Sequence, residues 1–432
     1  MTSIWSANTE HRSRPALDCD IKTDVLVIGG GMCGILAAHF LKQAGVHCTL
    51  VEAKTIGGGV TQNTTAKITA QHGLIYADLI RRFGAGTARQ YYDANTQAVQ
   101  RYCALAAHFS CDLETKTAYV YSVDDRDKLE REARAYQKLG IPSKIEENPM
   151  LPFNTAGAIV MEEQAQFHPL KLLYALADGL EIYENTFVQR LKGDIAYTAG
   201  GKIKAKHIIL ATHYPLVNIP GLYFLKLYQH RSYVMALKNA PRLDGMYLDE
   251  REGGLSFRTY GDFFLIGGGS HKTGKKGGGY AELSNFIKRT YPNIEPQYQW
   301  ATQDCMSLDS VPYIGRHRAG TKNLYVATGL NKWGMTGSMV AAELLSDLVL
   351  HGKSKWEALY NPHRPILSRQ LFGNIGGAAA GLLSFGRPRC AHMGCKLHWN
   401  TAEQSWDCAC HGSRFDCGGH VINNPAKKGI RL

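Results

Sequence analysis

The sequence predicts an α/β protein in three parts: a domain with a parallel sheet, an α+β domain with an antiparallel sheet, and a small all-β module at the C-terminal end. A strand, a glycine-rich turn, a helix and a second strand occupy residues 24–52, and residues 228–237 and 254–267 alternate as antiparallel strands do. Two Cys–His pairs lie within residues 390–411. A length of 432 residues leaves room for two or three such domains.

The first unit, residues 24–52, has the arrangement that binds a dinucleotide. Gly29 permits the tight turn after the first strand, Gly31 lets the backbone approach a pyrophosphate, and Gly34 allows close packing of helix against strand. The N-terminus of the helix favours phosphate, and Glu52 at the end of the second strand can accept hydrogen bonds from a ribose diol. This carboxylate suits FAD and NAD equally, so the unit alone leaves that choice open.

Three later segments complete the expected cofactor site. Residues 57–67 are small and hydroxyl-rich and suit a loop beneath a pyrophosphate and ribityl chain, and residues 207–212 form a parallel strand that ends in small residues. A helix that begins after residue 333 would direct its positive N-terminal end at a flavin ring, where negative charge develops on reduction. The candidate cofactor-binding residues in these segments are Thr61, Thr64, Thr65, Ala211, Thr212, Gly334, Met335 and Thr336.

The C-terminal segment carries Cys390-x-His392, fifteen intervening residues, and then Cys408-x-x-His411. Two thiolates on one iron and two imidazoles on the other are the ligands of a Rieske [2Fe–2S] cluster, with a potential of roughly −150 to +300 mV. Tetrahedral zinc is the alternative for two Cys and two His. Zinc fingers more often group a Cys pair before a His pair, so the mixed pairs favour the cluster.

These motifs, in this order and spacing, resemble the D-amino-acid-oxidase-like family of FAD-dependent oxidoreductases over roughly residues 20–350, with a Rieske module fused behind it. The resemblance implies a Rossmann-like FAD-binding fold of the glutathione-reductase-2 type, an antiparallel substrate domain, and a disulfide between Cys395 and Cys410. The implied FAD-binding pieces are about 20–75, 150–220 and 305–350, the substrate-domain pieces 76–149 and 221–304, the linker 351–388 and the Rieske domain 389–432.

The Rieske segment is short. In the family that it resembles, a set of base strands precedes the first cysteine, whereas here little more than a Gly/Ala-rich tract at residues 375–386 precedes Cys390. We therefore expect the cluster loops to rest on the flavoprotein body.

The resemblance further implies hydride transfer to flavin from a carbon next to nitrogen, which needs orientation and a charge partner more than acid–base chemistry. Arg258 lies on a strand that matches the family's substrate-facing sheet and could clamp a carboxylate, or could be a solvated strand residue. Arg231 and Tyr233 alternate on another such strand, where a structural salt bridge and a core aromatic are the alternatives. Lys332 and Trp333 adjoin the flavin-facing turn, where they could tune the flavin and close the pocket.

Cysteine usage and hydropathy favour a cytoplasmic location. Five of the eleven Cys lie in residues 390–432 and the others are scattered without pairing spacing. No apolar run approaches the length of a membrane span, and the N-terminal sequence does not resemble a secretory signal. Cys305 lies four residues before Asp309, near where some family members attach FAD through a thioether; a buried free Cys is the alternative.

We therefore expect an FAD-dependent oxidoreductase that oxidises an amine or amino-acid-like substrate and passes electrons singly through the cluster. Two alternatives remain open: a reductase that runs in the opposite direction from a donor protein, and a non-catalytic flavin and iron–sulfur redox sensor.

The net charge of +12 bears on the partners. A mildly basic solvated surface is one explanation, and a patch that attracts an acidic one-electron carrier protein is the other. The basic residues near the cluster motif are Arg387, Arg389, Lys396, Arg414, Lys427, Lys428 and Arg431. Nucleic acid is not expected as a partner, because no aromatic platform or recognition helix accompanies these charges.

Overall fold

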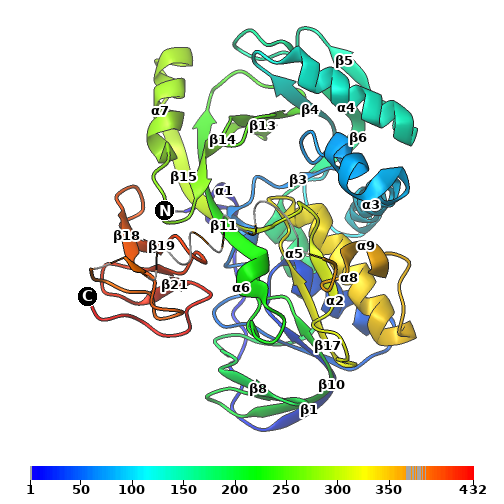
Figure 1. Ribbon diagram of the computed structural model, residues 1–432, viewed down its shortest axis with the longest axis vertical. Helices are drawn as coiled ribbons and strands as arrows, with labels where there is room; N and C mark the ends of the chain where they lie inside the picture. Colours follow the sequence, from blue (N-terminus) through cyan, green and yellow to red (C-terminus); the bar gives the residue numbers. More distant parts are fainter. Residues whose placement is uncertain are drawn as a thin grey trace.

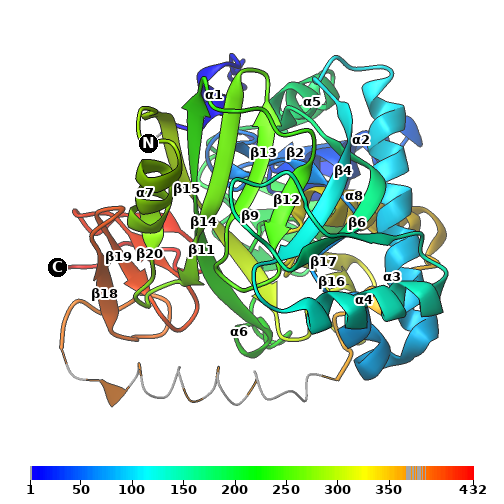
Figure 2. The same ribbon diagram turned by 90° about the horizontal axis from the view of Figure 1, so that it is seen from above.

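The computed structural model describes residues 2–365, 371, 374, 376, 381, 383–384 and 386–432. Two large sheets and one small sheet make up the molecule, and helices cover their outer faces (Figures 1 and 2).

An eight-stranded sheet carries the strand order β16-β17-β10-β1-β2-β7, with β8 and β9 forming a hairpin beside β10. Strands β17, β10, β1, β2 and β7 run parallel to one another, which confirms the predicted parallel-sheet domain. In β1, Val25 and Val27 face one core, and Leu26 and Ile28 face another, because successive side chains of a strand point to opposite faces. The bounds are β1 Ile21–Ile28, β2 Cys48–Val51, β7 Glu181–Tyr183, β8 Arg190–Lys192, β9 Ile195–Tyr197, β10 Lys202–Leu210, β16 Tyr313–Arg316 and β17 Leu324–Thr328.

A nine-stranded sheet carries the order β15-β11-β14-β13-β12-β4-β6-β3, with β5 beside β6. Its pairings are antiparallel except that of β12 with β4, as expected for the second domain. The bounds are β3 Lys67–Ile68, β4 Glu114–Ser122, β5 Lys144–Glu146, β6 Gly157–Gln166, β11 Leu227–Lys238, β12 Met246–Asp249, β13 Ser256–Tyr260, β14 Phe263–Lys272 and β15 Pro296–Ser307.

The division of the chain between the two sheets differs from the expected one. We expected residues 20–75 and 150–220 to belong to the FAD-binding pieces, but β3 and β6 from these ranges pair with each other in the nine-stranded sheet. A short apolar run reveals that a segment is a strand, but it does not reveal which sheet the strand joins.

Helices α2 and α8 pack against each other beneath the parallel sheet, and α5 packs on α2. Gly84 adopts a φ of 82° and kinks the long helix α3. The helix bounds are α1 Ile4–Ala7, α2 Met32–Gln43, α3 Tyr76–Ala106, α4 Arg126–Leu139, α5 Pro169–Ala177, α6 Tyr223–Lys226, α7 Gly279–Thr290, α8 Gly334–His351 and α9 Glu357–Tyr360. Within the described part of the chain, none of the helices has the length and apolar content that a membrane crossing needs.

The expected linker, residues 351–388, is not uniform. Its first part packs on the body: α9 lies there, and Arg364 forms an ion pair with Asp309 (Nε–Oδ2 2.6 Å) and lies 4.0 Å from the ring centroid of Tyr313. Much of the rest, including residues 366–370 and 377–380, lies outside the described residues.

The small sheet at the C-terminal end has the order β18-β19-β20-β21 and confirms the all-β module. Its strands are β18 Leu397–Asn400, β19 Ser405–Cys408, β20 Arg414–Phe415 and β21 Val421–Asn423. The module lies beside β11 and the end of α7 in both views (Figures 1 and 2). Apart from four cysteines, its hydrophobic core contains only Leu397, Phe415 and Ala426 among the described residues. So small a core gives little stability of its own.

Buried charges join this module to the body. Glu403, which precedes β19, accepts hydrogen bonds from Arg231 Nε of β11 (2.9 Å) and from Arg414 Nη2 of β20 (2.9 Å). Burial alone raises the pKa of Glu403, but the charges of Arg231 and Arg414 outweigh that effect and lower it below its ordinary value. Asn400 donates to Tyr233 Oη (3.4 Å). Arg231 and Tyr233, expected to face a substrate, therefore take their polar partners from the C-terminal module.

Removal of this shared carboxylate tests the interface. Glu403→Ala leaves two buried guanidinium groups short of a partner, so we expect the free energy of unfolding at pH 7 to fall by about 3–5 kcal/mol. Chemical denaturation measures it, with the exposed Glu295→Ala as the matched control. Because the folded-state pKa of Glu403 is lowered, its contribution is complete above the unfolded-state pKa and is lost as pH falls through the folded-state pKa. The effect of the substitution should therefore shrink in acid. An undiminished effect in acid would contradict the ion-pair explanation.

Candidate active site and metal centre

A cavity of about 1200 Å³ lies between the two large sheets. Its wall includes the turn before α2, residues 57–65, parts of β11 and β14, the N-terminus of α8, and residues 421–427 of the C-terminal module. Small-molecule pockets commonly measure roughly 300–1,000 Å³, so this cavity has room for a dinucleotide together with a substrate.

The glycines of the first turn have little space for a side chain. A Cβ on Gly29, whose φ is 113°, would lie 2.4 Å from the carbonyl oxygen of Ala211, and a Cβ on Gly34 would lie 1.9 Å from that of Gly29. These contacts bring β1, the start of α2 and the end of β10 together as a backbone cradle. Gly31 is the N-cap residue of α2 and lines the cavity.

The carboxylate of Glu52 is held by backbone N–H groups at the mouth of this cradle. Gly30 N donates to Oε2 (2.7 Å) and Lys54 N donates to Oε1 (2.9 Å). Burial raises the pKa of Glu52, and these hydrogen bonds oppose that shift. The side chain is thereby fixed where a ribose diol would meet it.

Most other candidate cofactor residues meet around the same cavity. Its lining includes Thr61, Thr64, Thr65, Ala211, Thr212, Gly334 and Met335. Thr336 differs, since it is not part of the lining: its hydroxyl donates to Thr69 O (3.3 Å) and lies 3.0 Å from His72 Nε2. Thr336 lies in the first turn of α8, and its side chain contacts Thr69 and His72 instead of the cavity.

Lys332 and Trp333 lie at the N-terminal end of α8 and both line the cavity. The Trp333 ring stacks on His72, with centroids 4.5 Å apart and planes at 14°. Lys332 Nζ donates to Ser270 Oγ (3.1 Å). Burial lowers the pKa of Lys332, and the nearby Asp304 carboxylate opposes that shift.

Arg258 does not reach the cavity, so the expectation that it clamps a substrate carboxylate is not supported. Its side chain is fully buried, and Nη1 donates to the carbonyls of Thr65 (2.7 Å) and Ala66 (2.8 Å). Its guanidinium carbon lies 5.5 Å from the Trp5 ring centroid. The strand does turn Arg258 inward, but the loop of residues 64–66 covers it, which strand periodicity does not reveal.

Cys305 lies on β15 and lines the cavity. Its Sγ lies 3.5 Å from Thr328 Oγ1, and burial raises the pKa of its thiol to about 12. Cys305 is therefore a buried free cysteine in the wall of the cavity. A thioether bond between Cys305 and FAD stays a prediction.

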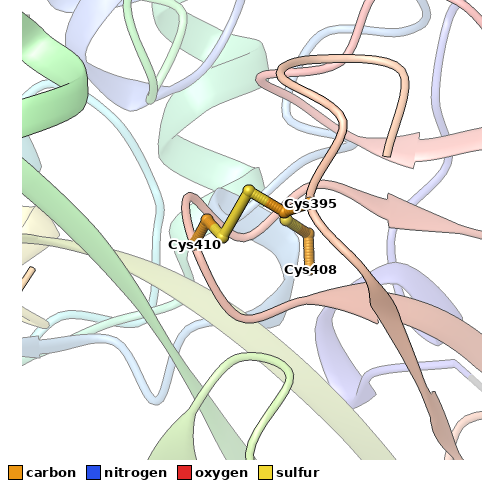
Figure 3. Close-up of side chains that lie close together, drawn as sticks. All are labelled: Cys395, Cys408 and Cys410. Carbon is orange, nitrogen blue, oxygen red and sulfur yellow. A yellow bond between two sulfur atoms is a disulfide. The ribbon is translucent and has the colours of Figure 1, made fainter. Parts of the chain in front are cut away.

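The cysteines of the C-terminal module gather at one end of its sheet. Cys395 and Cys410 form a disulfide, and Cys408 lies beside them, with the three Sγ atoms within 4.8 Å of one another (Figure 3). The disulfide sulfurs are not thiolates, so Cys408 is the ligand of that group. The hydrogen bond between Cys390 and Cys408 lowers the pKa of Cys390 and raises that of Cys408, so Cys390 is the first of the two to become a thiolate.

Two imidazoles complete the donor set. The rings of His392 and His411 lie 5.0 Å apart between centroids, and the Nδ1 atom of each is buried without a hydrogen-bond partner among the described residues. Burial lowers the pKa of both, that of His411 to about 4, so both are neutral at pH 7. Two thiol sulfurs and two orphaned imidazole nitrogens fit the ligand set of a Rieske cluster.

Two glutamines connect this donor set to the cavity wall. Gln229 of β11 donates from Nε2 to the carbonyl of His411 (3.1 Å), and its Oε1 lies 3.2 Å from Nε2 of the cavity-lining His213. Gln303 of β15 donates to Gln229 Oε1 (2.6 Å) and to the carbonyl of Gly412 (2.9 Å). Asn218 Nδ2 lies 3.3 Å from His392 Nε2, which orients that ring.

Comparisons with known proteins agree with this geometry. The model of the family described as FAD dependent oxidoreductase matches residues 24–348, and that of the Rieske [2Fe-2S] domain matches residues 381–432. The chain belongs to this family of FAD-dependent oxidoreductases and carries a Rieske domain.

Individual proteins support the assignment. The chain is 35% identical to YhfW of Bacillus subtilis (strain 168), named as a Rieske 2Fe-2S iron-sulfur protein, over 99% of this chain and 97% of that one. It is 22% identical to gamma-glutamylputrescine oxidoreductase of Escherichia coli (strain K12), over 84% and 93% of the two chains. Glycine oxidase from Geobacillus kaustophilus has the same fold, with a TM-score of 0.67, 20% identity, and 80% and 99% coverage.

As a member of this family with its Rieske domain, the protein binds FAD and a [2Fe–2S] cluster. The residues present fit both groups: a backbone cradle with Glu52 for the dinucleotide, and two sulfurs with two nitrogens for the irons. The domain match favours iron over the zinc alternative. Sequence patterns did not indicate Gln229, Gln303 or Glu403, because single amide and charged side chains in strands and turns carry no spacing signal.

The glycine cradle can be tested by one added methyl group. Gly34→Ala places a Cβ against the carbonyl oxygen of Gly29, so we expect FAD content to fall at least about tenfold, since a shift of this turn moves the pyrophosphate site. Gly86→Ala is the control, because a Cβ there meets nothing within 4 Å. Absorbance at 450 nm per chain measures the retained flavin. Equal flavin content in both variants would contradict the assignment of the cradle.

The ligand assignment can be tested within the module. We expect Cys408→Ser to lose the iron and the low-average-g EPR signal of a Rieske cluster, because a serine hydroxyl does not replace the thiolate. Cys417→Ser is the control, since Cys417 is an exposed free cysteine of the same module. Iron quantification and EPR of dithionite-reduced protein give the result. Iron retained in Cys408→Ser, or about one zinc in the wild type, would overturn the assignment.

Proposed function

We propose that this protein oxidises an amine or amino-acid-like small molecule and releases the electrons singly through its Rieske cluster. When bound, FAD supplies a two-electron acceptor and the cluster supplies a one-electron carrier. The substrate carbon loses a hydride, which FAD would accept when bound, and the nitrogen loses a proton, so that the amine becomes an imine. The two electrons of the hydride would leave in two steps, each reducing one equivalent of a one-electron acceptor, and the two protons would pass to solvent.

The substrate class has two supports. Gamma-glutamylputrescine oxidoreductase and glycine oxidase are, by name, proteins that act on an amine and on an amino acid, and this chain is similar to both. The space in front of the N-terminus of α8 is bounded by Trp333, which His72 holds by stacking, so the chain presents a shaped wall to a small molecule there. Rigid walls orient a substrate for transfer.

The contact between cavity and cluster carries the electron-transfer proposal. His213 lines the cavity, Gln229 binds His213 and the carbonyl of the cluster ligand His411, and Gln303 binds the next carbonyl. Among the described residues, a hydrogen-bond path from the cavity to the backbone of a cluster ligand therefore runs through His213 and Gln229. His411 is itself 3% exposed, so its side of the cluster faces the flavoprotein and not the solvent.

The acceptor is proposed to be an acidic one-electron carrier protein or a quinone-linked one. Exposed basic residues near the cluster are Arg387, Arg389, Lys427, Lys428 and Arg431. Arg414 does not belong to this set, because it is buried and bound to Asp407 and Glu403. Met393, next to the ligand His392, is 39% exposed, which gives a carrier a point of close approach to the cluster. A positive patch increases the rate of association with an acidic partner.

Family membership makes the protein an oxidoreductase, so the non-catalytic sensor finds no support. A reductase, in which electrons flow from the cluster to the flavin, would use the same contacts. The relative potentials of flavin and cluster decide which direction of electron flow is favoured. A cluster potential well below that of the flavin would favour the reductase.

A cluster-free variant separates the two half-reactions. With an amine that bleaches the wild-type flavin without oxygen, Cys408→Ser should bleach at a rate within about threefold of wild type, because Cys408 is not part of the cavity wall. Its steady-state reduction of a one-electron acceptor such as cytochrome c should fall at least about tenfold, since the exit route is lost.

Cys417→Ser, with both rates unchanged, is the control for that experiment. Fast production of hydrogen peroxide by the wild type, or equal acceptor reduction in Cys408→Ser, would contradict transfer through the cluster.

A further inference from the structure

The last part of the Rieske domain lies in the wall of the flavin cavity. Residues 421–427, which comprise β21 and residues 424–427, all line that cavity. They fall within the match to the Rieske domain, residues 381–432, and outside the match to the FAD-dependent oxidoreductase family, which ends at residue 348. This 421–427 segment therefore belongs to one domain and faces the cofactor cavity of the other.

On the flavin side, the segment is bound to the loop after β10. The side-chain amide of Asn424 donates from Nδ2 to the carbonyl oxygens of Thr212 (2.9 Å) and Tyr214 (3.2 Å). Thr212 follows Ala211, whose carbonyl oxygen lies close to Gly29 in the glycine cradle. Asn424 thus fixes the 421–427 segment to the same turn that forms the cradle.

On the cluster side, the segment is bound to the loop that carries the ligand His411. The backbone N–H of Ala426 donates to Ser413 Oγ (3.0 Å), and both residues are buried. Gln229 Nε2 lies within hydrogen-bond distance of two carbonyl oxygens, that of His411 (3.1 Å) and that of Asn424 (3.3 Å). The ligand loop and the cavity wall are therefore held by a common set of hydrogen bonds.

Apolar packing contributes little to the position of the segment. Ala426 is its one member of the module's hydrophobic core among the described residues, and Val421 packs against that core while partly buried. Ile422 is 37% exposed. Because the buried apolar area is small, the hydrogen bonds of Asn424 and Ala426 decide where the segment lies.

We propose that the 421–427 segment is part of the FAD site and that Asn424 holds it there, so that FAD and the cluster each strengthen the binding of the other. This inference goes beyond the proposed function, since it concerns retention of the cofactors and not the substrate or the direction of electron flow. FAD, when bound, fills the cavity against the segment, and the cluster fixes the loop to which the segment is bound. Two ligands that favour the same arrangement of a segment bind cooperatively.

Release of FAD from the oxidised holoenzyme tests the role of Asn424, with the rise in flavin fluorescence after dilution as the readout. We expect Asn424→Ala to release FAD at least about fivefold faster than wild type, because the hydrogen bonds to Thr212 and Tyr214 are lost. Iron content and the EPR signal of the cluster should be retained. Thr401→Ala is the control, since Thr401 is exposed in the same module and does not line the cavity.

A double-mutant cycle tests the coupling between the two cofactors. Cys408→Ser, which removes the cluster, should release FAD at least about threefold faster than wild type, because the ligand loop no longer holds the segment firmly. In the double variant Asn424→Ala/Cys408→Ser, the rate should exceed that of the faster single variant by no more than about twofold, since both changes free the same segment. Faster release does not alter the rate at which bound flavin is bleached.

The reverse effect is measured on the wild-type sequence alone. After removal of FAD, a ferrous chelator should withdraw iron from the dithionite-reduced protein at least about threefold faster than from the holoenzyme, and added FAD should restore the slower rate. In Asn424→Ala, the presence of FAD should change the rate of iron loss less than it does in wild type.

Three outcomes would overturn the proposal: equal release of FAD by Asn424→Ala and wild type, equal release by Cys408→Ser and wild type, or single effects that multiply in the double variant. If FAD is attached through Cys305, the same comparisons are made in a Cys305→Ser background. If Asn424→Ala loses iron, Asn424→Leu replaces it, because leucine keeps the volume but has no donor. No substrate or electron acceptor is used, so failure of the proposed function would leave these results unaffected.

Discussion

Strand β11 is shared by both cofactor sites, and its buried polar side chains must find partners on each side of the strand. Arg231 reaches Glu403 of the Rieske module, and Gln229 reaches the carbonyl of His411. Without the module, the side chains of Arg231 and Gln229 would be either buried without hydrogen-bond partners or exposed to water. The position of the cluster relative to the flavin cavity is thus set by hydrogen-bond satisfaction, not by a flexible tether.

The glycine at position 412 makes this contact possible. It has a φ of 81°, and a Cβ there would lie 2.6 Å from the Cβ of Gln229. Gly274 does the same from the other side, where a Cβ would lie 2.4 Å from the backbone nitrogen of Ala409. The loop that follows β14 therefore packs its backbone on the cluster loop. Backbone contact on both sides keeps the cluster loops close to the flavoprotein.

Local chemistry in the sequence predicted the two cofactors, FAD and a [2Fe–2S] cluster. The sequence did not reveal which way a strand residue faces or which segment lies over it. Gly29, Gly34 and Glu52 act through their immediate neighbours, so their spacing is sufficient to indicate a dinucleotide turn. The roles of Arg258 and Arg231 depend instead on which segment lies over each strand. That is decided by residues 64–66 in one case and by Glu403 in the other, and both are far away in the sequence. A segment that covers a strand from far away in the sequence leaves no periodic pattern. The same limit explains why the residues of β6 were expected in the FAD-binding domain.

The burial of the metal ligands has a consequence for how the protein is made. Cys390, Cys408 and His411 are each no more than 3% exposed once the loops lie against β11. A donor protein that delivers iron and sulfide needs direct access to these ligands, and the closed interface denies it. The burial of these ligands thus links assembly of the metal centre to docking of the C-terminal segment, because both use the same loops against β11.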